Sequence, residues 1–282
     1  MFHKIQNYRT PINSIPMKNV TLFLLASLLA ICTFAQDVQD TGLRSHATLF
    51  GIGATNRLDT YLSPLEYTGL ELRMAREHQR QTKLMNGRVS MQNMLQGSFA
   101  PCESPTEDGT ALCGMADWDF AWHYHWKFNE RLTVMAGPGT GIHGGFFYNT
   151  RNGNNPAEAL LSWDVSASGI IEYAIPMKRR PITLRYQANI PLAGVMFSPN
   201  YGQSYYEIFS LGNSDHNICF THPFQAFSVD QFLTADIPVG SHTLRAGYLC
   251  SIRQSHVNSI KRHTWSNLFM IGYVKYFQLV KK

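Results

Sequence analysis

The segment from residue 117 to 125 holds residue types whose spacing could carry chemistry. Asp117, Asp119, His123 and His125 are separated by even numbers of positions, so on a β-strand their side chains point to the same side. A carboxylate beside an imidazole can activate water or a serine. These four residues are therefore weak candidates for the catalytic site of a hydrolase. The alternative is a plain polar strand face, because any such face brings these residue types together by geometry alone.

Motifs for other kinds of site are absent from the sequence. Neither GxSxG nor HExxH occurs, and no Cys/His spacing suits a zinc site. Basic residues are scattered, whereas a nucleic-acid interface needs them gathered on one face. His143 lies among glycines, where an ordinary strand residue is as good an interpretation as a functional one. We therefore expect no metal, no cofactor and no nucleic-acid partner.

The candidate residues lie on a segment in which polar and aromatic side chains alternate. The opposite side of 117–128 consists of large aromatic residues: Trp118, Phe120, Trp122, Tyr124, Trp126 and Phe128. A period of two predicts a β-strand. The same period recurs from residue 43 onward, most clearly at 161–175, 182–192 and 242–253, where Leu249 interrupts the polar face. The sequence therefore predicts an all-β protein.

The alternating faces fit either a soluble β-sandwich or a transmembrane barrel, and two observations favour the barrel. Six aromatic residues on one face exceed what the interior of a small barrel accommodates, whereas lipid accepts them. Connections also alternate in length, as they do in outer-membrane barrels. Short turns stand at 129–130, 178–180 and 240–241, and long polar loops at about 100–114, 147–157, 193–223 and 254–264. Charged residues make up 15% of the chain, below the roughly 25% of soluble domains.

This alternation of turns and loops also counts the strands. It predicts a closed antiparallel up-and-down barrel of ten strands, with 193–223 as one long outer excursion. Strand-like residues inside that excursion, Tyr205, Tyr206, Ile208 and Phe209, leave twelve strands as the alternative. Both counts are even, as is usual for bacterial barrels.

The start of the chain resembles an export signal. Lys18 precedes an uncharged run from Val20 to Ala35, and Thr33-Phe34-Ala35 offers small residues for a signal peptidase. We expect cleavage after Ala35, which divides the chain into an N-terminal extension and signal, 1–35, and a barrel, 36–282. A transmembrane anchor and a lipoprotein signal ending at Cys32 are the alternatives. The run is short for a spanning helix, and Ile31 is large for a lipoprotein signal. The expected location is the outer membrane of a Gram-negative bacterium.

Cleavage would leave four cysteines, Cys102, Cys113, Cys219 and Cys250. An even number in an exported protein suggests disulfides. Cys102 and Cys113 share one polar segment, so we expect these two to be bonded. The partners of Cys219 and Cys250 stay open, and free buried thiols are the alternative.

The block 59–70, which contains YLSPLEYTG, resembles a family of outer-membrane barrels from Gram-negative bacteria that is catalogued as a domain of unknown function. The signal ending Phe34-Ala35-Gln36 is its other recognisable part. The resemblance extends over most of the chain after the signal. It implies the location and the fold, and it brings no catalytic residues.

The polar strand faces would place charges of both signs inside the barrel: Glu71, Arg73, Asp164, Glu172, Arg185, Asp230 and Arg245. Buried charges must pair, so we expect a largely filled polar lumen in a structural or binding protein. A narrow pore for small polar solutes is one alternative, and a hydrolase using Asp117, Asp119, His123 and His125 is another. Expected partners are membrane lipid, the barrel-assembly machinery and an extracellular ligand at the aromatic loop 193–223.

Overall fold

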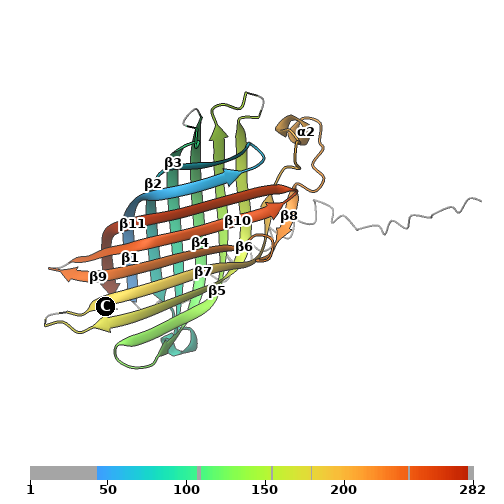
Figure 1. Cartoon of the computed structure of the whole chain (residues 1–282). Coiled ribbons are helices and arrows are strands. Elements are labelled where there is room, and N and C mark those ends of the chain that lie inside the picture. The colour runs from blue at the N-terminus through green and yellow to red at the C-terminus, as the bar shows by residue number, and fades with distance from the viewer. Residues whose placement is uncertain (1–42, 107–108, 154, 179, 241, 279–282) are drawn as a thin grey trace, which may run out of the picture. The chain divides into compact units, whose positions relative to one another are not determined.

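The computed structural model describes residues 43–278 apart from 107–108, 154, 179 and 241. Ten long strands form a closed antiparallel barrel (Figure 1). They are β1 (Leu43–Asp59), β2 (Ser63–Gln81), β3 (Val89–Glu103), β4 (Thr110–Lys127), β5 (Leu132–Asn149), β6 (Ala157–Ile175), β7 (Ile182–Phe197), β9 (Ser228–Val239), β10 (His242–Val257) and β11 (Ile260–Gln278). The predicted signal, residues 1–35, lies outside the described residues.

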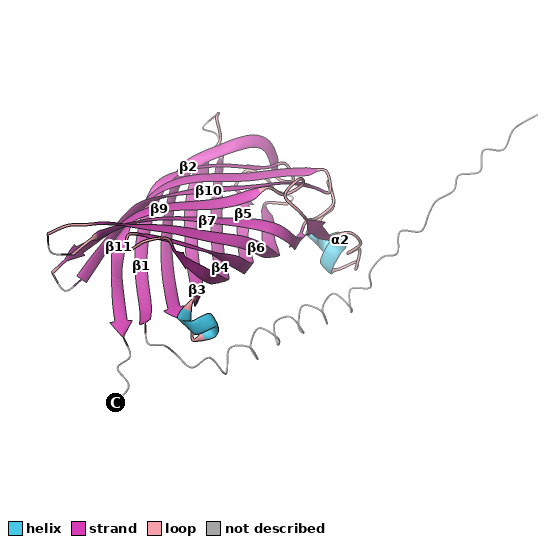
Figure 2. Ribbon diagram, turned by 90° about the horizontal axis from the view of Figure 1, so that it is seen from below, coloured by secondary structure: helices cyan, strands magenta, loops and turns pink. Residues whose placement is uncertain are grey.

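Neighbouring strands of the barrel follow one another in the chain, and β1 closes the ring against β11 (Figure 2). The excursion between β7 and β9 holds the helix α2 (Tyr205–Phe209) and the short strand β8 (Ile218–Thr221), which pairs with β7 outside the ring. A 3-10 turn η1 (Leu84–Gly87) connects β2 and β3. The ten-strand prediction is confirmed, because the excursion adds one short strand and not two crossings. No helix among the described residues has the length and apolar character needed to span a membrane.

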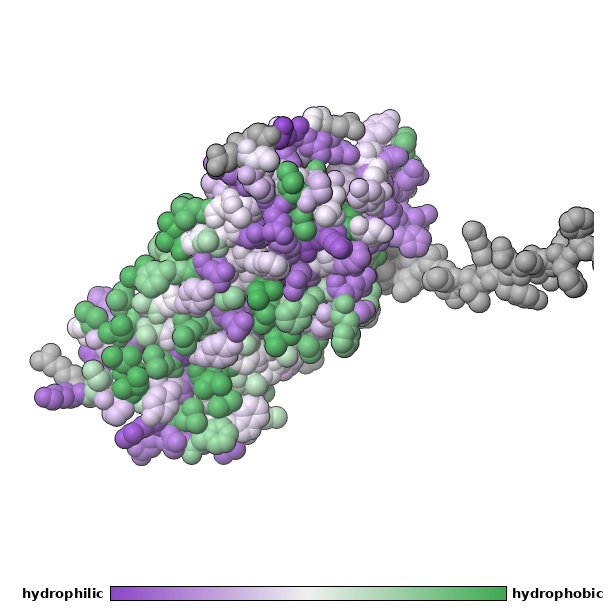
Figure 3. All heavy atoms as spheres, viewed as in Figure 1, coloured by the Kyte–Doolittle hydropathy of each residue, from purple (hydrophilic) through white to green (hydrophobic). Residues whose placement is uncertain are grey.

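Strand faces divide as the alternation predicts. On β4, Asp117 and His123 are buried, and Trp126 is exposed. On β2, Leu70, Leu72 and Met74 are exposed between buried charged residues. On the face drawn in Figure 3, hydrophobic residues gather toward the barrel end with the short turns, and hydrophilic residues dominate toward α2. An apolar outer surface of this kind is the lipid-facing band of a membrane barrel.

The strands are longer than the sequence predicts at their outer ends. They run to 19 residues, although about 9–11 suffice to cross a bilayer. The prediction of a long loop at 254–264 is wrong. A two-residue turn, Asn258-Ser259, joins β10 and β11, with φ of 51° and 62°. Such a turn with two positive φ values matches the twist of the strands it joins. The segment 100–114 is also largely strand, whereas 147–157 is the predicted connection, with only the ends of β5 and β6 in it. The strands stay paired in these outer segments, as Glu103 with Thr110 and Val257 with Ile260 show.

Candidate functional site

An apolar cluster occupies part of the barrel interior. Its members come from six strands: Ala47, Leu49, Ala75, Met94, Phe232, Leu249, Leu268, Met270 and Val274. Leu249, which interrupts the polar face of β10 in sequence, is 4% exposed and belongs to this cluster. Apolar side chains packed inside a barrel exclude water there, so this part of the lumen is core rather than channel.

A first network of charges lies on the side of the short turns, and Glu77 is its centre. Arg185 Nη2 lies 2.7 Å from Glu77 Oε1, and Arg245 Nη1 is paired with the other oxygen, Oε2. Gln92 Nε2 also donates to Glu77 Oε1, at 2.5 Å. Arg245 binds both oxygens of Asp236, at 2.6 and 2.8 Å. Glu77 therefore pairs with two buried guanidinium groups at once.

The Arg185–Glu77 pair crosses the whole lumen. Glu77 lies on β2 and Arg185 on β7. Four strands separate β2 from β7 in either direction around the ring, β3–β6 one way and β1, β11, β10 and β9 the other. The contact at 2.7 Å therefore joins side chains from opposite walls of the barrel. Arg185 and Arg245 were predicted in the lumen and are buried there, while Glu172 contacts Arg185 only at 3.5 Å.

Glu77 and Asp236 were missed by the sequence reasoning. Both could have been found by counting in steps of two, from Glu71 on β2 and from Asp230 on β9, since residues at even spacing share a strand face.

A second network lies toward the outer loops and surrounds His143. Asp117 Oδ1 lies 2.8 Å from His143 Nδ1 and 2.7 Å from Arg253 Nη1. His143 Nε2 lies 3.0 Å from Asp164 Oδ2. Ionised carboxylates only accept hydrogen bonds, so both ring nitrogens must donate and the imidazole is a cation. Arg253 on β10 again reaches the opposite wall, because four strands separate β10 from β4 in either direction.

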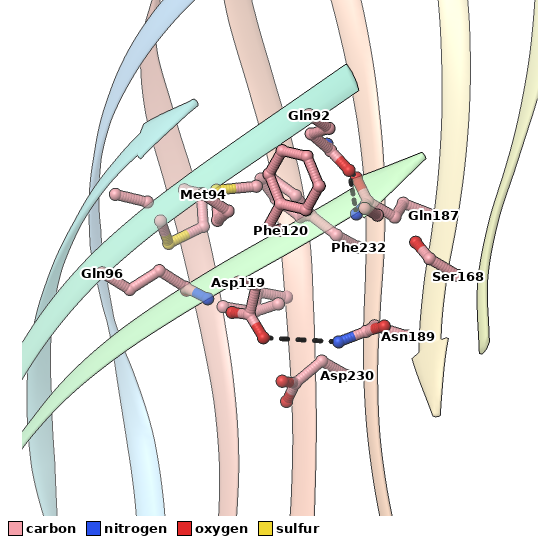
Figure 4. A pocket seen from close by; sticks show the side chains of 14 residues that line it. Gln92, Met94, Gln96, Asp119, Phe120, Ser168, Gln187, Asn189, Asp230 and Phe232 are labelled. Atoms are coloured by element: carbon pink, nitrogen blue, oxygen red, sulfur yellow. Dashed lines mark hydrogen bonds between the residues drawn. The ribbon is translucent and has the colours of Figure 1, made fainter. Parts of the chain in front are cut away.

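The structure does not bring the four catalytic candidates together. His123 is hydrogen-bonded to Ser168 Oγ at 2.9 Å, and His125 to Ser90 Oγ at 2.8 Å. Asp117 stands six residues from His123, about 20 Å along an extended strand. Asp119 receives one hydrogen bond of 3.5 Å, from Asn189 (Figure 4). The histidine beside Asp117 is His143, its direct neighbour on β5.

Two further clusters of charged residues complete the outer half. Glu71 accepts from Arg57 at 2.9 Å and from Arg73 at 2.6 Å, as predicted for buried charges of opposite sign. Nearer the loops, Arg262 lies 3.0 Å from Asp59 and also contacts Glu158.

Two cavities lie between these groups. The larger, about 150 Å³, is lined by Arg57, Asp117, His143, Asp164, Asp230 and Arg253 among others. The smaller, about 40 Å³, lies between Asp119, Gln187 and Asn189 and is bounded by the apolar side chains of Met94 and Phe232 (Figure 4). Asn189 and Asp230 line both. The described residues contain no group of His, Cys, Asp and Glu that could hold a metal ion.

Cys102 and Cys113 lie on β3 and β4, not in a loop. Both are buried beside Tyr67 and Phe147, and the Cys102 thiol donates to the carbonyl of Ala100 at 3.8 Å. They are diagonal neighbours across the strand pair, since Cys102 faces Ala111 and Cys113 faces Ala100. All four cysteines of the described part have free thiols, and the disulfide stays a prediction.

The aromatic residues of the outer excursion pack largely on one another. The ring of Tyr205 lies 5.9 Å from Phe209 and 6.1 Å from Phe197, and burial raises the pKa of Tyr205 to about 12. Ser204 and Glu207 form a capping box at the start of α2. Tyr201, Tyr206 and Phe209 remain exposed, so these three rings form the open part of the predicted binding surface.

Comparison with known proteins agrees with this architecture. A family model described as a protein of unknown function, DUF3316, matches residues 20–282. The outer membrane protease OmpT from Escherichia coli is similar in structure, with a TM-score of 0.52 at 6% identity over 87% of this chain and 100% of that chain. The translocator domain of autotransporter NalP from Neisseria meningitidis is similar at a TM-score of 0.40 and 10% identity, over 91% of this chain and 97% of that one. None of the curated proteins matches the chain in sequence.

Proposed function

This chain belongs to the DUF3316 family of outer-membrane β-barrels, and we propose that it is a closed, non-conducting barrel with a binding function. In this proposal the lumen does not transport solutes. Its inner half holds the barrel shut, and its outer half keeps a polar cavity for a ligand.

The observation that carries the proposal is the contact between opposite walls. The Arg185–Glu77 and Arg253–Asp117 pairs, both at 2.7 Å, each join strands on opposite sides of the ring. Buried ion pairs of this kind stay formed, because separating the partners would leave an uncompensated buried charge. The apolar cluster around Phe232 and Leu249 fills further space. Together these features support a barrel without a continuous water path.

A hydrolytic role is less well supported by the same geometry. A general base needs an unprotonated ring nitrogen within reach of its proton donor. Both nitrogens of His143 are engaged by carboxylates. His123 has a serine partner but no carboxylate to orient it among the hydrogen bonds of the described residues. The likeness to OmpT is one of fold alone, so it adds nothing to this candidate.

Single-channel recording of the purified protein in planar bilayers tests the proposal. We expect no steady conductance. The double variant Glu77→Ala, Arg185→Ala removes both ends of one cross-lumen pair, while Arg245 keeps Asp236, and should conduct more than the native protein. Steady openings of the native barrel, comparable to those of a wide porin, would contradict the closed lumen.

A further inference from the structure

The barrel wall contains a break between β7 and β9. Pairing of these strands ends at Asn189 with Asp230, and pairing of β7 with β8 begins at Gly194 with Thr221. In the described ladder, residues 190–193 pair with neither strand. Pro191 has no N–H to donate, and the register shifts opposite it, between Val165 and Ser166. A wall without these hydrogen bonds can admit a group from the side.

The larger cavity reaches this break. Among its lining residues, Asn189 and Pro191 lie on the β7 side, and Ser228 and Thr221 lie across from them. Outside the break the surface is apolar: Leu192 is 50% exposed and Phe227 43%. The cavity is therefore polar within and bordered by hydrophobic side chains at its lateral edge.

The break lies near the outer edge of the apolar band. Pro191 stands nine residues beyond Ile182, the start of β7. At about 3.3 Å per residue and a tilt of about 45°, this is roughly 20 Å along the membrane normal, against an apolar band about 25 Å tall. A group entering here would come from the outer edge of the bilayer.

Two buried polar atoms on residues that line the cavity have no hydrogen-bond partner among the described residues. They are Nη1 of Arg57 and Oδ1 of Asp164, on side chains of residues that are 1% and 8% exposed. The first is a donor on a cation and the second an acceptor on an anion. An unmade buried hydrogen bond is costly, so a ligand carrying charges of both signs would satisfy both.

We infer that this cavity binds a zwitterionic group, an ammonium with a phosphate, and that the group belongs to a lipid whose head enters through the break. The ammonium donates to Asp164 and Asp230, and the phosphate accepts from Arg57. The acyl chains stay outside, against Leu192 and Phe227. This inference rests on the proposed binding function and adds the ligand class and the route.

Binding to the purified full chain in nanodiscs tests both parts, with native mass spectrometry as the readout. The probes are lyso-phosphatidylethanolamine, lyso-phosphatidylglycerol and free phosphoethanolamine. We expect the first to bind at least about tenfold more tightly than the second, which lacks the ammonium, and more tightly than the third, which lacks the chain. Equal binding of the two lipids, or no binding of either, would overturn the assignment. Tight binding of free phosphoethanolamine alone would overturn the lipid and its lateral entry.

Matched variants test separately the lateral entry through the break and the recognition of the headgroup by charged residues. Ser228→Trp fills the break and should weaken lipid binding by about tenfold or more, whereas Ala188→Trp, lower on β7, should not. Asp164→Asn should weaken binding, whereas Glu172→Gln, a carboxylate change away from the cavity, should leave it intact. Heat-resistant migration on a gel shows that each variant is folded, and unchanged binding by folded S228W would overturn lateral entry. Conductance of the same samples distinguishes failure of the proposed function from failure of this inference. A conducting barrel contradicts the proposed function. A non-conducting barrel that binds no lipid contradicts only this inference.

Discussion

Glu77 is the residue on which the inner network depends. It compensates Arg185 from the opposite wall and Arg245 from β10, which two strands of the ring separate from β2, and it is 2% exposed. Where the lumen is filled, water cannot take the place of a carboxylate that compensates the charges of two guanidinium groups. Its loss should therefore cost more than the loss of any surface carboxylate.

Glu77→Gln should lower the free energy of unfolding by about 3 kcal/mol or more, because two cations lose their shared anion. Urea unfolding of the reconstituted barrel, followed by heat-modifiable migration, measures the change. Glu66→Gln is the matched control: Glu66 is exposed and accepts one hydrogen bond, from Asn56 at 3.0 Å. Its substitution should change stability by under about 0.5 kcal/mol. Equal effects of the two changes would argue against a sealing role for Glu77.

Strand β4 shows how one element serves lipid and lumen together. Its odd-numbered residues, such as Asp117 and His123, are buried within the barrel. Its even-numbered residues form the aromatic row, in which Phe120 and Trp122 rings meet edge to face at 4.6 Å. The pleat of the strand is enough to separate lumen-facing from lipid-facing residues, since successive side chains point to opposite faces of the sheet.

Trp122→Arg should destabilise the barrel by about 2–4 kcal/mol, because it places a cation against the hydrocarbon near the middle of the membrane. Trp122→Leu, which keeps an apolar side chain, should cost much less. Refolding into vesicles at increasing urea measures both. Brominated lipids should also quench the fluorescence of Trp118, Trp122 and Trp126. If none of the three is quenched, the outward assignment of this face is wrong.

At the scale of the whole molecule, the barrel and its place in the outer membrane fit together. Pairing of β1 with β11 joins the first and last strands into a ring, and a bilayer tolerates strands only in closed form. Reaching that membrane requires export, for which residues 18–35 supply the predicted signal. These residues lie outside those the structure describes.

Cleavage should follow Ala35, because Thr33-Phe34-Ala35 comes directly after the apolar run. N-terminal sequencing of the membrane-bound protein should then begin at Gln36. An Ala35→Arg variant should block cleavage and leave a precursor larger by the mass of the signal, while Gln36→Asn should not. Recovery of residues 20–35 in the native membrane-bound protein would show that no signal is removed.

The sequence by itself determined the strands and their facing, because a period of two and short turns depend only on local chain geometry. It favoured ten strands and left twelve as the alternative, which the structure decided. It also placed Glu71, Arg73, Arg185 and Arg245 inside the barrel. It did not determine the outer ends of the strands, because turn residues such as Asn258 and Ser259 look like a longer loop in sequence.

Only the tertiary structure decided which polar residues meet. Asp117 pairs with His143 and Arg253 rather than with His123, and Glu77 meets Arg185 across 108 positions of sequence. Strand periodicity fixes the side on which a residue lies. Its partner depends on the register of neighbouring strands and on how the ring closes. Contacts across the lumen arise only after ten strands have closed, so no local pattern in the chain could have revealed them.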